Sequence, residues 1–242
     1  MLKSLVKRFA ERHGYEILGP SGGSFATRRS LAGLLRQEQI NLVLDVGANT
    51  GQFSDKLWAG GYRGRIISFE PLASPHAELR SKAERYPNWT IAERTAIGAE
   101  RGSVEIHVSG NSQSSSILEM LPSHSESVPE SAYVGSETVP VNRLDDLCTL
   151  SSHDRVLLKI DVQGYERQVL EGAHRVLSTC RAVYTEMSFL PLYEGQILAR
   201  ELWDLLVAQG FEPWSMEPAF RDPVTYRTLQ IDGVFVRRSA RS

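Results

Sequence analysis

NLVLDVGANTGQF, residues 41–53, is an apolar run that closes on Asp45 and then meets two glycines, Gly47 and Gly51, before a helical pattern begins. This order predicts a strand, a tight turn and a helix. In a parallel α/β sheet the turn lies at the carboxyl edge of the strand, where glycines let the backbone approach a ligand that a Cβ atom would repel. We therefore expect a ligand site here, although an ordinary turn between a strand and a helix has the same pattern.

A second short strand supports this interpretation. The run RIISFEP, residues 65–71, ends on Glu70 and Pro71, about 25 residues after Asp45. In nucleotide-binding α/β folds, an acid about 20 residues after the first turn accepts hydrogen bonds from ribose hydroxyls. Glu70 is therefore expected to bind the ribose of a cofactor. Taken alone, an acid at a strand end is more often a surface charge.

Length, charge and cysteine content limit the number of domains, the partners and the compartment that we expect for this protein. The 242 residues, 41% hydrophobic and 23% charged, are enough for one core, so residues 1–242 are expected to form a single domain. A net charge of -2 gives no electrostatic case for nucleic acid as a partner. Cys148 and Cys180 are too few for a disulfide framework and suit a reducing compartment. Without a secretory signal or an apolar run near the ~18 residues that span a bilayer, the sequence predicts a cytoplasmic protein.

The N-terminal residues 1–39 are expected to form helices that cap the core. Residues 1–17 place apolar side chains at helical spacing among lysines and arginines, the pattern of a basic amphipathic helix. Such a helix can cover the core or the cofactor, which we favour, or it can make peripheral contact with a membrane. Residues 25–39 predict a second helix with three leucines turned inward.

An insertion is predicted over residues 98–142. A turn at residues 98–102 followed by residues 104–108, which alternate apolar and polar as a half-exposed strand does, indicates an inserted hairpin, and residues 138–142 predict a later short strand. Between them, residues 111–137 are rich in Ser, Pro and Glu and are expected to form a mobile loop near the site. Ser115 belongs to the part of this loop that is expected to close over the cofactor. His107 is a candidate proton acceptor at the substrate entrance, although a solvated histidine is the commoner outcome.

Acids end four of the predicted strands, at Asp45, Glu70, Asp161 and Glu186. Because the carboxyl ends of parallel strands share one edge of a sheet, these acids are expected to gather where ligands bind. Lys159 lies two residues before Asp161 and so on the same face of its strand. It is expected to neutralise a buried acid rather than to act as a base.

The combination of LDVGANTG (44–51), FEP (69–71), LKIDVQGYE (158–166) and VFV (234–236) resembles the FkbM family of methyltransferases, from about residue 43 to residue 237. The first motif is also similar to the D/E-x-G-x-G-x-G turn of S-adenosylmethionine-dependent methyltransferases, with Asn49 in place of the middle glycine. The resemblance implies a Rossmann-like class I methyltransferase fold: an α/β sheet, mostly parallel with an antiparallel last strand, and helices on both faces. It also implies S-adenosylmethionine as cofactor.

From the strand ends and the resemblance together, cofactor contacts are expected at Asp45, Gly47, Ala48, Asn49, Gly51, Glu70, Pro71, Ala96, Ile97, Ser115 and Asp161. Catalytic roles are expected for Asp161, Glu186, Lys159 and His107. A hydroxyl acceptor needs either a general base or a divalent ion that lowers its pKa. If Mg²⁺ serves this purpose, Asp161 and Glu186 are its expected ligands.

The resemblance implies O-methylation, and three functions stay open. The first is methylation of a sugar hydroxyl in a glycolipid or a glycosylated natural product, and the second is methylation of a polyketide or another small-molecule hydroxyl. The third is a degenerate cofactor-binding or scaffolding module. A nicotinamide dehydrogenase would use the same sheet, but residues 45–51 lack the third glycine of a dinucleotide loop. The sequence does not predict the oligomeric state.

Overall fold

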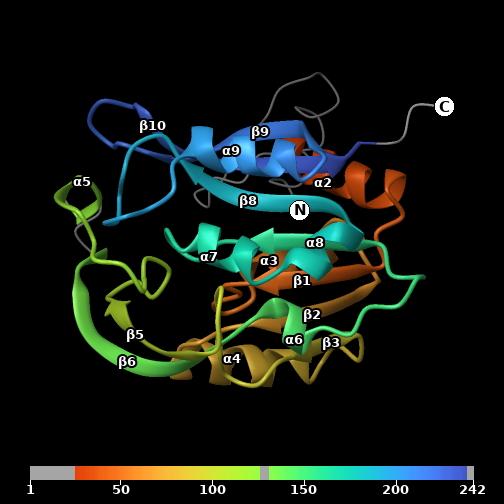
Figure 1. Cartoon of the computed structure of the whole chain (residues 1–242), viewed down its shortest axis with the longest axis horizontal. Helices are drawn as coiled ribbons and strands as arrows, with labels where there is room; N and C mark the ends of the chain where they lie inside the picture. Colours follow the sequence, from red (N-terminus) through yellow and green to blue (C-terminus); the bar gives the residue numbers. More distant parts are fainter. Residues whose placement is uncertain (1–24, 126–130, 239–242) are drawn as a thin grey trace, which may run out of the picture.

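A computed structural model describes residues 25–125 and 131–238 of the chain (Figure 1). The amphipathic helix predicted over residues 1–17 lies outside the described residues. Seven strands form the central sheet in the order β3-β2-β1-β7-β8-β10-β9. Their bounds are β1 Leu42–Val46, β2 Arg65–Phe69, β3 Trp89–Ile91, β7 Val156–Ile160, β8 Cys180–Ser188, β9 Phe211–Arg221 and β10 Thr228–Arg237.

Five neighbouring strands of this sheet, β3, β2, β1, β7 and β8, run parallel to one another. Strand β10 pairs antiparallel with both β8 and β9. This arrangement confirms the mostly parallel α/β sheet with an antiparallel last strand. Every residue of β1 and of β7 is buried, because helices cover both faces of a parallel sheet and its inner strands become continuous apolar runs. The carboxyl ends of these parallel strands share one edge of the sheet. We call it the ligand edge, because ligands bind at this edge in open α/β sheets.

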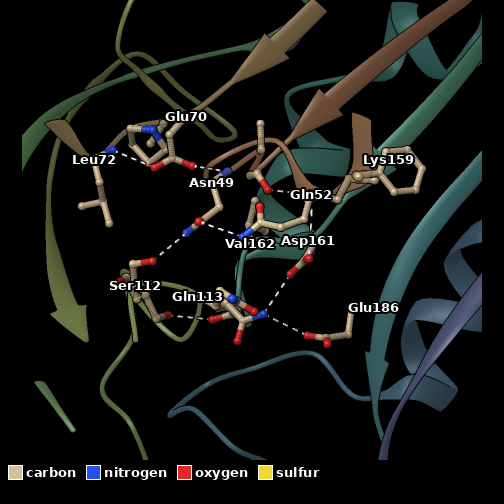
Figure 2. A pocket seen from close by; sticks show the side chains of 18 of the residues that line it. Asn49, Gln52, Glu70, Leu72, Ser112, Gln113, Lys159, Asp161, Val162 and Glu186 are labelled. Carbon is tan, nitrogen blue, oxygen red and sulfur yellow. Dashed lines mark hydrogen bonds and ion pairs between the residues drawn. The ribbon is translucent and has the colours of Figure 1, made fainter. Parts of the chain in front are cut away.

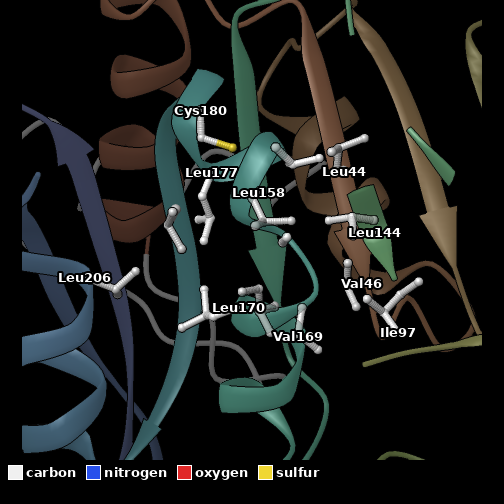
Figure 3. Packing of buried hydrophobic residues seen from close by; sticks show 14 of the residues in the cluster. Leu44, Val46, Ile97, Leu144, Leu158, Val169, Leu170, Leu177, Cys180 and Leu206 are labelled. Carbon is white, nitrogen blue, oxygen red and sulfur yellow. The ribbon is translucent and has the colours of Figure 1, made fainter. Parts of the chain in front are cut away.

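Each face of the sheet has its own apolar core. Leu42, Leu44 and Val46 of β1 pack with α6 Leu144–Leu147, α7 Glu166–Glu171, α8 His174–Thr179 and α9 Ala199–Ala208 (Figure 3). Val43 points to the opposite face, where α2 Phe25–Gln37, α3 Gln52–Ala59 and α4 Ala73–Ala83 contribute side chains. Successive side chains of a strand alternate between faces, so β1 contributes to both cores and is fixed in place by them.

The inserted segment forms a separate three-stranded sheet in the order β4-β6-β5. Its strands are β4 Ala96–Ile97, β5 Gly102–Ser109 and β6 Tyr133–Asn142, with β5 antiparallel and β4 parallel to β6. The hairpin is longer than the sequence predicted, because β6 begins at Tyr133 within the expected loop. The loop also contains α5 Pro122–Ser125. This small sheet extends beyond the ligand edge of the main sheet (Figure 1).

Across residues 25–125 and 131–238, we find no helix with both the length and the apolar character needed to cross a membrane.

Candidate functional site

The turn after β1 keeps the backbone expected from its motif. Gly47, Asn49 and Gly51 all have positive φ, at 75°, 47° and 87°. Asn is among the residues that best tolerate this left-handed region, and the side-chain oxygen of Asn49 accepts a hydrogen bond from the amide of Thr50 at 2.8 Å. A Cβ atom at Gly47 would lie only 1.9 Å from the carbonyl oxygen of Asp161. The turn therefore needs glycine at position 47 and accepts asparagine at position 49.

Glu70, directly after β2, closes this turn from the side. Its Oε2 accepts a hydrogen bond from the amide of Asn49 at 2.7 Å, and its Oε1 accepts one from the amide of Leu72 at 2.9 Å (Figure 2). Burial raises the pKa of Glu70 to about 7, although both hydrogen bonds act in the opposite direction. Each carboxylate oxygen has a second lone pair, so the side chain can still accept hydrogen bonds from a ligand.

Lys159 of β7 connects the turn to the neighbouring strand. The register places it opposite Asp45 of β1, and its Nζ lies 3.1 Å from Asp45 Oδ1 and 3.7 Å from Asp161 Oδ2. The same nitrogen donates a hydrogen bond to the carbonyl of Gly47 at 2.6 Å. Burial acts to lower the pKa of Lys159, but the neighbouring carboxylates outweigh it and the pKa lies above its ordinary value. Lys159 is therefore a cation that neutralises buried acid.

Two acids meet at the ends of β7 and β8. The Nε2 of Gln163 donates hydrogen bonds both to Asp161 Oδ1 at 2.8 Å and to Glu186 Oε2 at 3.0 Å. Burial and the nearby Asp161 carboxylate raise the pKa of Glu186 well above its ordinary value. The side chain of Asp161 remains 40% exposed. Asp161 can therefore reach a ligand in the pocket, whereas the Glu186 carboxyl beside it is buried.

These groups surround an open pocket with a volume of about 250 Å³. Figure 2 shows Glu70 and Glu186 at opposite sides of the view, with Asn49 and Asp161 between them. The predicted site residues that line this pocket are Gly47, Ala48, Asn49, Glu70, Pro71, Ala96, Ser115, Lys159, Asp161 and Glu186.

Three residues predicted to contact the cofactor lie away from the pocket wall. Asp45 has no exposed surface and faces Lys159 within the sheet. Gly51 is turned toward the core between β3 and α4, since a Cβ atom there would lie 2.7 Å from the ring of Trp89 and 3.0 Å from Leu79. Ile97 packs in the apolar core. These positions shape the turn and its support, and the structure gives them no place among the lining residues.

His107 also lies outside the pocket wall. Its ring stacks on Tyr133 with centroids 4.8 Å apart, and its Nε2 lies 3.2 Å from Glu119 Oε1. Because β6 begins earlier than predicted, Tyr133 provides this aromatic partner on the neighbouring strand. The ring is thus directed along the hairpin rather than toward Asp161.

The inserted loop crosses the pocket and contacts both sides of it. Asn49 Nδ2 donates to Ser112 Oγ at 3.2 Å, and Ser116 Oγ donates to the carbonyl of Gln163 at 2.6 Å. The loop also pairs with its own hairpin, where the amide and carbonyl of His107 exchange hydrogen bonds with Ser116. These contacts hold Ser115 at the pocket wall.

Several lining residues were not recognised from the sequence. They are Gln52, Lys56, Gln113, Gln163, Tyr184 and Asp232. The Tyr184 hydroxyl donates to Asp232 Oδ2 at 2.5 Å, and Asp232 stands opposite Glu186 in the antiparallel pairing of β10 with β8. The motif LKIDVQGYE (158–166), which contains Gln163, is the sequence feature that could have indicated this residue. No comparable sequence feature indicates that β10 pairs with β8 so as to bring Asp232 to the pocket.

The donor set does not fit a Mg²⁺ site. Among the described residues, no three side chains of the types His, Cys, Asp and Glu gather in a way that could hold a metal ion. Asp161 and Glu186 both accept hydrogen bonds from the Gln163 amide, so N–H groups occupy the place between them where a cation would bind. Mg²⁺ instead requires near-octahedral oxygen ligands.

The chain is similar to known proteins over most of its length. A model of the methyltransferase FkbM domain matches residues 45–213. The 2-O-methyltransferase NoeI of Sinorhizobium fredii is 28% identical over 212 residues, which cover 85% of this chain and 84% of that protein. AMB antimetabolite synthetase AmbE of Pseudomonas aeruginosa is 30% identical over 202 residues, which cover 71% of this chain but 9% of that protein.

Among solved structures, magnesium protoporphyrin IX methyltransferase of Synechocystis PCC 6803 with bound S-adenosylmethionine is similar, with 14% identity and a TM-score of 0.46. The alignment covers 98% of this chain and 97% of that one. The family model spans more than half of the chain and begins at the strand end from which the site is built. The chain therefore belongs to the FkbM family and is an S-adenosylmethionine-dependent methyltransferase.

Proposed function

We propose that this enzyme methylates a hydroxyl group of a sugar in a glycolipid or a glycosylated natural product. The observation that carries the proposal is the polar wall of the pocket beside Asp161, formed by Gln163, Tyr184, Glu186 and Asp232. These side chains can exchange hydrogen bonds with a hydroxyl-rich ring. The name of the relative NoeI, a 2-O-methyltransferase, supports a hydroxyl acceptor.

The opposite wall fits the cofactor. We assign the turn at Gly47 to Asn49, together with Glu70 and Ala96, to binding it, because all of them line the pocket. Glu70 is buried yet lines the pocket, and each of its oxygens has a second lone pair with which it can accept a hydrogen bond from a ribose hydroxyl. When bound, S-adenosylmethionine supplies an electrophilic methyl group. The protein must then align an acceptor oxygen with it and remove a proton.

We assign proton removal to Asp161. Its carboxylate is held on one side by Lys159 and on the other by Gln163, while part of its surface remains open to the pocket. In the proposed step, Asp161 would accept the proton of the acceptor hydroxyl while the acceptor oxygen takes the methyl group, whose bond to the sulfonium sulfur breaks, so that the products are the O-methylated acceptor and S-adenosylhomocysteine. General base catalysis of this kind typically contributes about 10²- to 10⁴-fold. Because the donor set does not fit Mg²⁺, no metal takes part in this scheme.

We keep a cytoplasmic location and peripheral membrane contact as parts of the proposal. Cys148 and Cys180 are both buried free thiols, which suits a reducing compartment. Membrane contact rests on the basic pattern of residues 1–17, outside the described residues. A lipid-linked acceptor would be consistent with it.

A labelled-methyl assay tests the function. The protein is incubated with S-adenosylmethionine and matched acceptors: a lipid-linked oligosaccharide, the same oligosaccharide without lipid, and a polyketide with free hydroxyls. Transfer to a sugar oxygen, located by mass spectrometry, is the expected result. Transfer to the polyketide alone would replace the sugar with the alternative acceptor. Binding of S-adenosylhomocysteine without turnover on any acceptor would favour a scaffolding module.

A further inference from the structure

Gln163 occupies the point where the pocket's acidic wall and the inserted loop meet. It lies two residues after Asp161 and has a left-handed backbone, with φ of 54°. Its Nε2 donates to Asp161 and Glu186, and its Oε1 accepts a hydrogen bond from the hydroxyl of Tyr193 at 2.8 Å. Its backbone carbonyl accepts a hydrogen bond from Ser116. One residue thus contacts the segment directly after β7, strand β8, the loop before α9 and the inserted segment.

The chemistry of these partners fixes the direction of the amide. A primary amide offers two N–H donors on one side and an oxygen acceptor on the other. Asp161, as a carboxylate, can only accept, and the reversed amide would set oxygen against oxygen there. In the observed direction, both N–H groups face acids and the oxygen faces the hydroxyl of the buried Tyr193.

The backbone around Gln163 is held independently of its side chain. Glu166 Oε1 accepts hydrogen bonds from the amides of Gly164 at 3.1 Å and Val162 at 3.4 Å. Gly164 has φ of 102°, and a Cβ atom there would lie 3.3 Å from Tyr193. A change of the Gln163 side chain alone therefore leaves the turn in place.

We propose that Gln163 is a positioning residue that holds the Asp161 carboxylate toward the acceptor hydroxyl and keeps it apart from Glu186. This inference rests on the proposed function, in which Asp161 accepts the acceptor proton. Two neighbouring carboxyl groups without an intervening donor tend to share one proton, which would remove the base. The two N–H groups of Gln163 satisfy both acids at once, and Lys159 faces the other oxygen of Asp161. The Asp161 carboxylate is thereby fixed in direction, with a nitrogen donor at each of its two oxygens.

Two substitutions of Gln163 distinguish the loss of the bridge to Asp161 from the addition of a further negative charge beside it. Gln163→Asn keeps an amide and tolerates the left-handed backbone, but it is one methylene too short to bridge Asp161 and Glu186. Gln163→Glu keeps the length and replaces the donor with a third carboxyl group. We expect kcat to fall about 10- to 100-fold in both variants, as for a lost hydrogen bond to a charged group. KM for the acceptor and Kd for S-adenosylhomocysteine should change less than about threefold.

The pH profile distinguishes positioning from a structural role. The acid limb of kcat should move to higher pH in both variants, and further for Gln163→Glu, because a carboxylate that loses a donor or gains a like charge holds its proton more tightly. Tyr193→Phe should give a smaller shift of the same sign, since the amide loses its orienting partner. Gln39→Asn is the matched control: Gln39 also has positive φ, at 53°, and is outside the pocket wall. Its kcat and pH profile should equal those of the wild type.

The proposal is overturned if Gln163→Asn turns over normally. It is also overturned if kcat, cofactor affinity and Tm fall together while the acid limb of the profile stays in place. Failure of the proposed function gives a different result, because then the wild type methylates no sugar or Asp161→Asn retains full activity. An active wild type, an inactive Asp161→Asn and normal Gln163 variants would reject this inference alone.

Discussion

The ammonium nitrogen of Lys159 lies 3.1 Å from Asp45 Oδ1, and the two side chains are only 5% and 0% exposed. Removal of one member of a buried pair leaves the other charge uncompensated, which typically costs about 3–5 kcal/mol. Lys159→Met should therefore lower the free energy of unfolding by about that amount. Urea denaturation followed by circular dichroism measures this change.

The double variant Asp45→Asn with Lys159→Met provides the control for this pair. It leaves no charge unpaired between β1 and β7, so it should recover part of the stability lost in the single variant. If Lys159→Met instead keeps full stability and loses only turnover, Lys159 serves as the base and the structural role assigned here is wrong.

Cofactor affinity should depend on pH through Glu70. The pKa of Glu70 is raised to about 7 in the free protein, and hydroxyl donors from a ribose favour its ionised form. Binding therefore releases a proton, so affinity is full above pH 7 and falls as pH drops below it. Calorimetry with S-adenosylhomocysteine should show about a tenfold weaker Kd at pH 6 than at pH 8.

Glu70→Gln is the matched control, because an amide has no proton to release in this range. Its affinity should be weaker at pH 8 and nearly constant between pH 6 and pH 8. Equal pH dependence in wild type and variant would assign the effect to another group.

Asp161→Asn tests the proton acceptor directly. The amide keeps the shape of the side chain but accepts no proton, so kcat should fall by roughly 10²- to 10⁴-fold. The Kd for S-adenosylhomocysteine should stay nearly unchanged, since the ribose contact is assigned to Glu70. Simultaneous loss of cofactor binding and turnover would contradict a role confined to the acceptor.

Chelation tests the metal alternative. The Gln163 amide satisfies both Asp161 and Glu186, so prolonged treatment with EDTA should leave the initial rate of methyl transfer unchanged. Loss of activity that returns with added Mg²⁺ would show that these carboxylates rearrange around an ion, which would replace the base scheme.

Gly47→Ala should disrupt the turn after β1. Its Cβ atom would lie 1.9 Å from the carbonyl oxygen of Asp161, at a residue with φ of 75°. Backbone strain and steric overlap together should cost about 2–4 kcal/mol and weaken cofactor binding. Gly33→Ala in α2 is the control, because its Cβ atom would have no neighbour within 4 Å. This variant should raise the free energy of unfolding by about 0.5–1 kcal/mol, measured by thermal unfolding.

The sheet could be predicted because its inner strands carry their signal locally. β1 and β7 are short buried strands, apolar except for Asp45 and Lys159, which end at the glycine turn and at Asp161. Helical periods between the predicted strands indicate a βαβ order. The carboxyl ends of such strands must share an edge. This rule was enough to bring Glu70, Lys159, Asp161 and the first turn to one pocket.

The details that sequence reasoning missed depend on geometry between distant segments. The direction of the Gln163 side chain follows from a left-handed residue and three partners on other elements. The alternation of β5 did not reveal that β6 would begin at Tyr133 and provide a partner for His107. Asp232 reaches the pocket through an antiparallel register that local periodicity does not encode.

Because β10 runs antiparallel to β8, the two walls of the pocket come from separate parts of the sheet. The turn after β1 and Glu70 belong to the parallel half, whereas Tyr184 and Asp232 lie on the paired strands β8 and β10. We therefore expect substitutions on β10 to alter the wall that we assign to the acceptor without any change in the glycine turn. On the proposed assignment, acceptor preference can diverge through this strand, in evolution or in engineering, while cofactor use is retained.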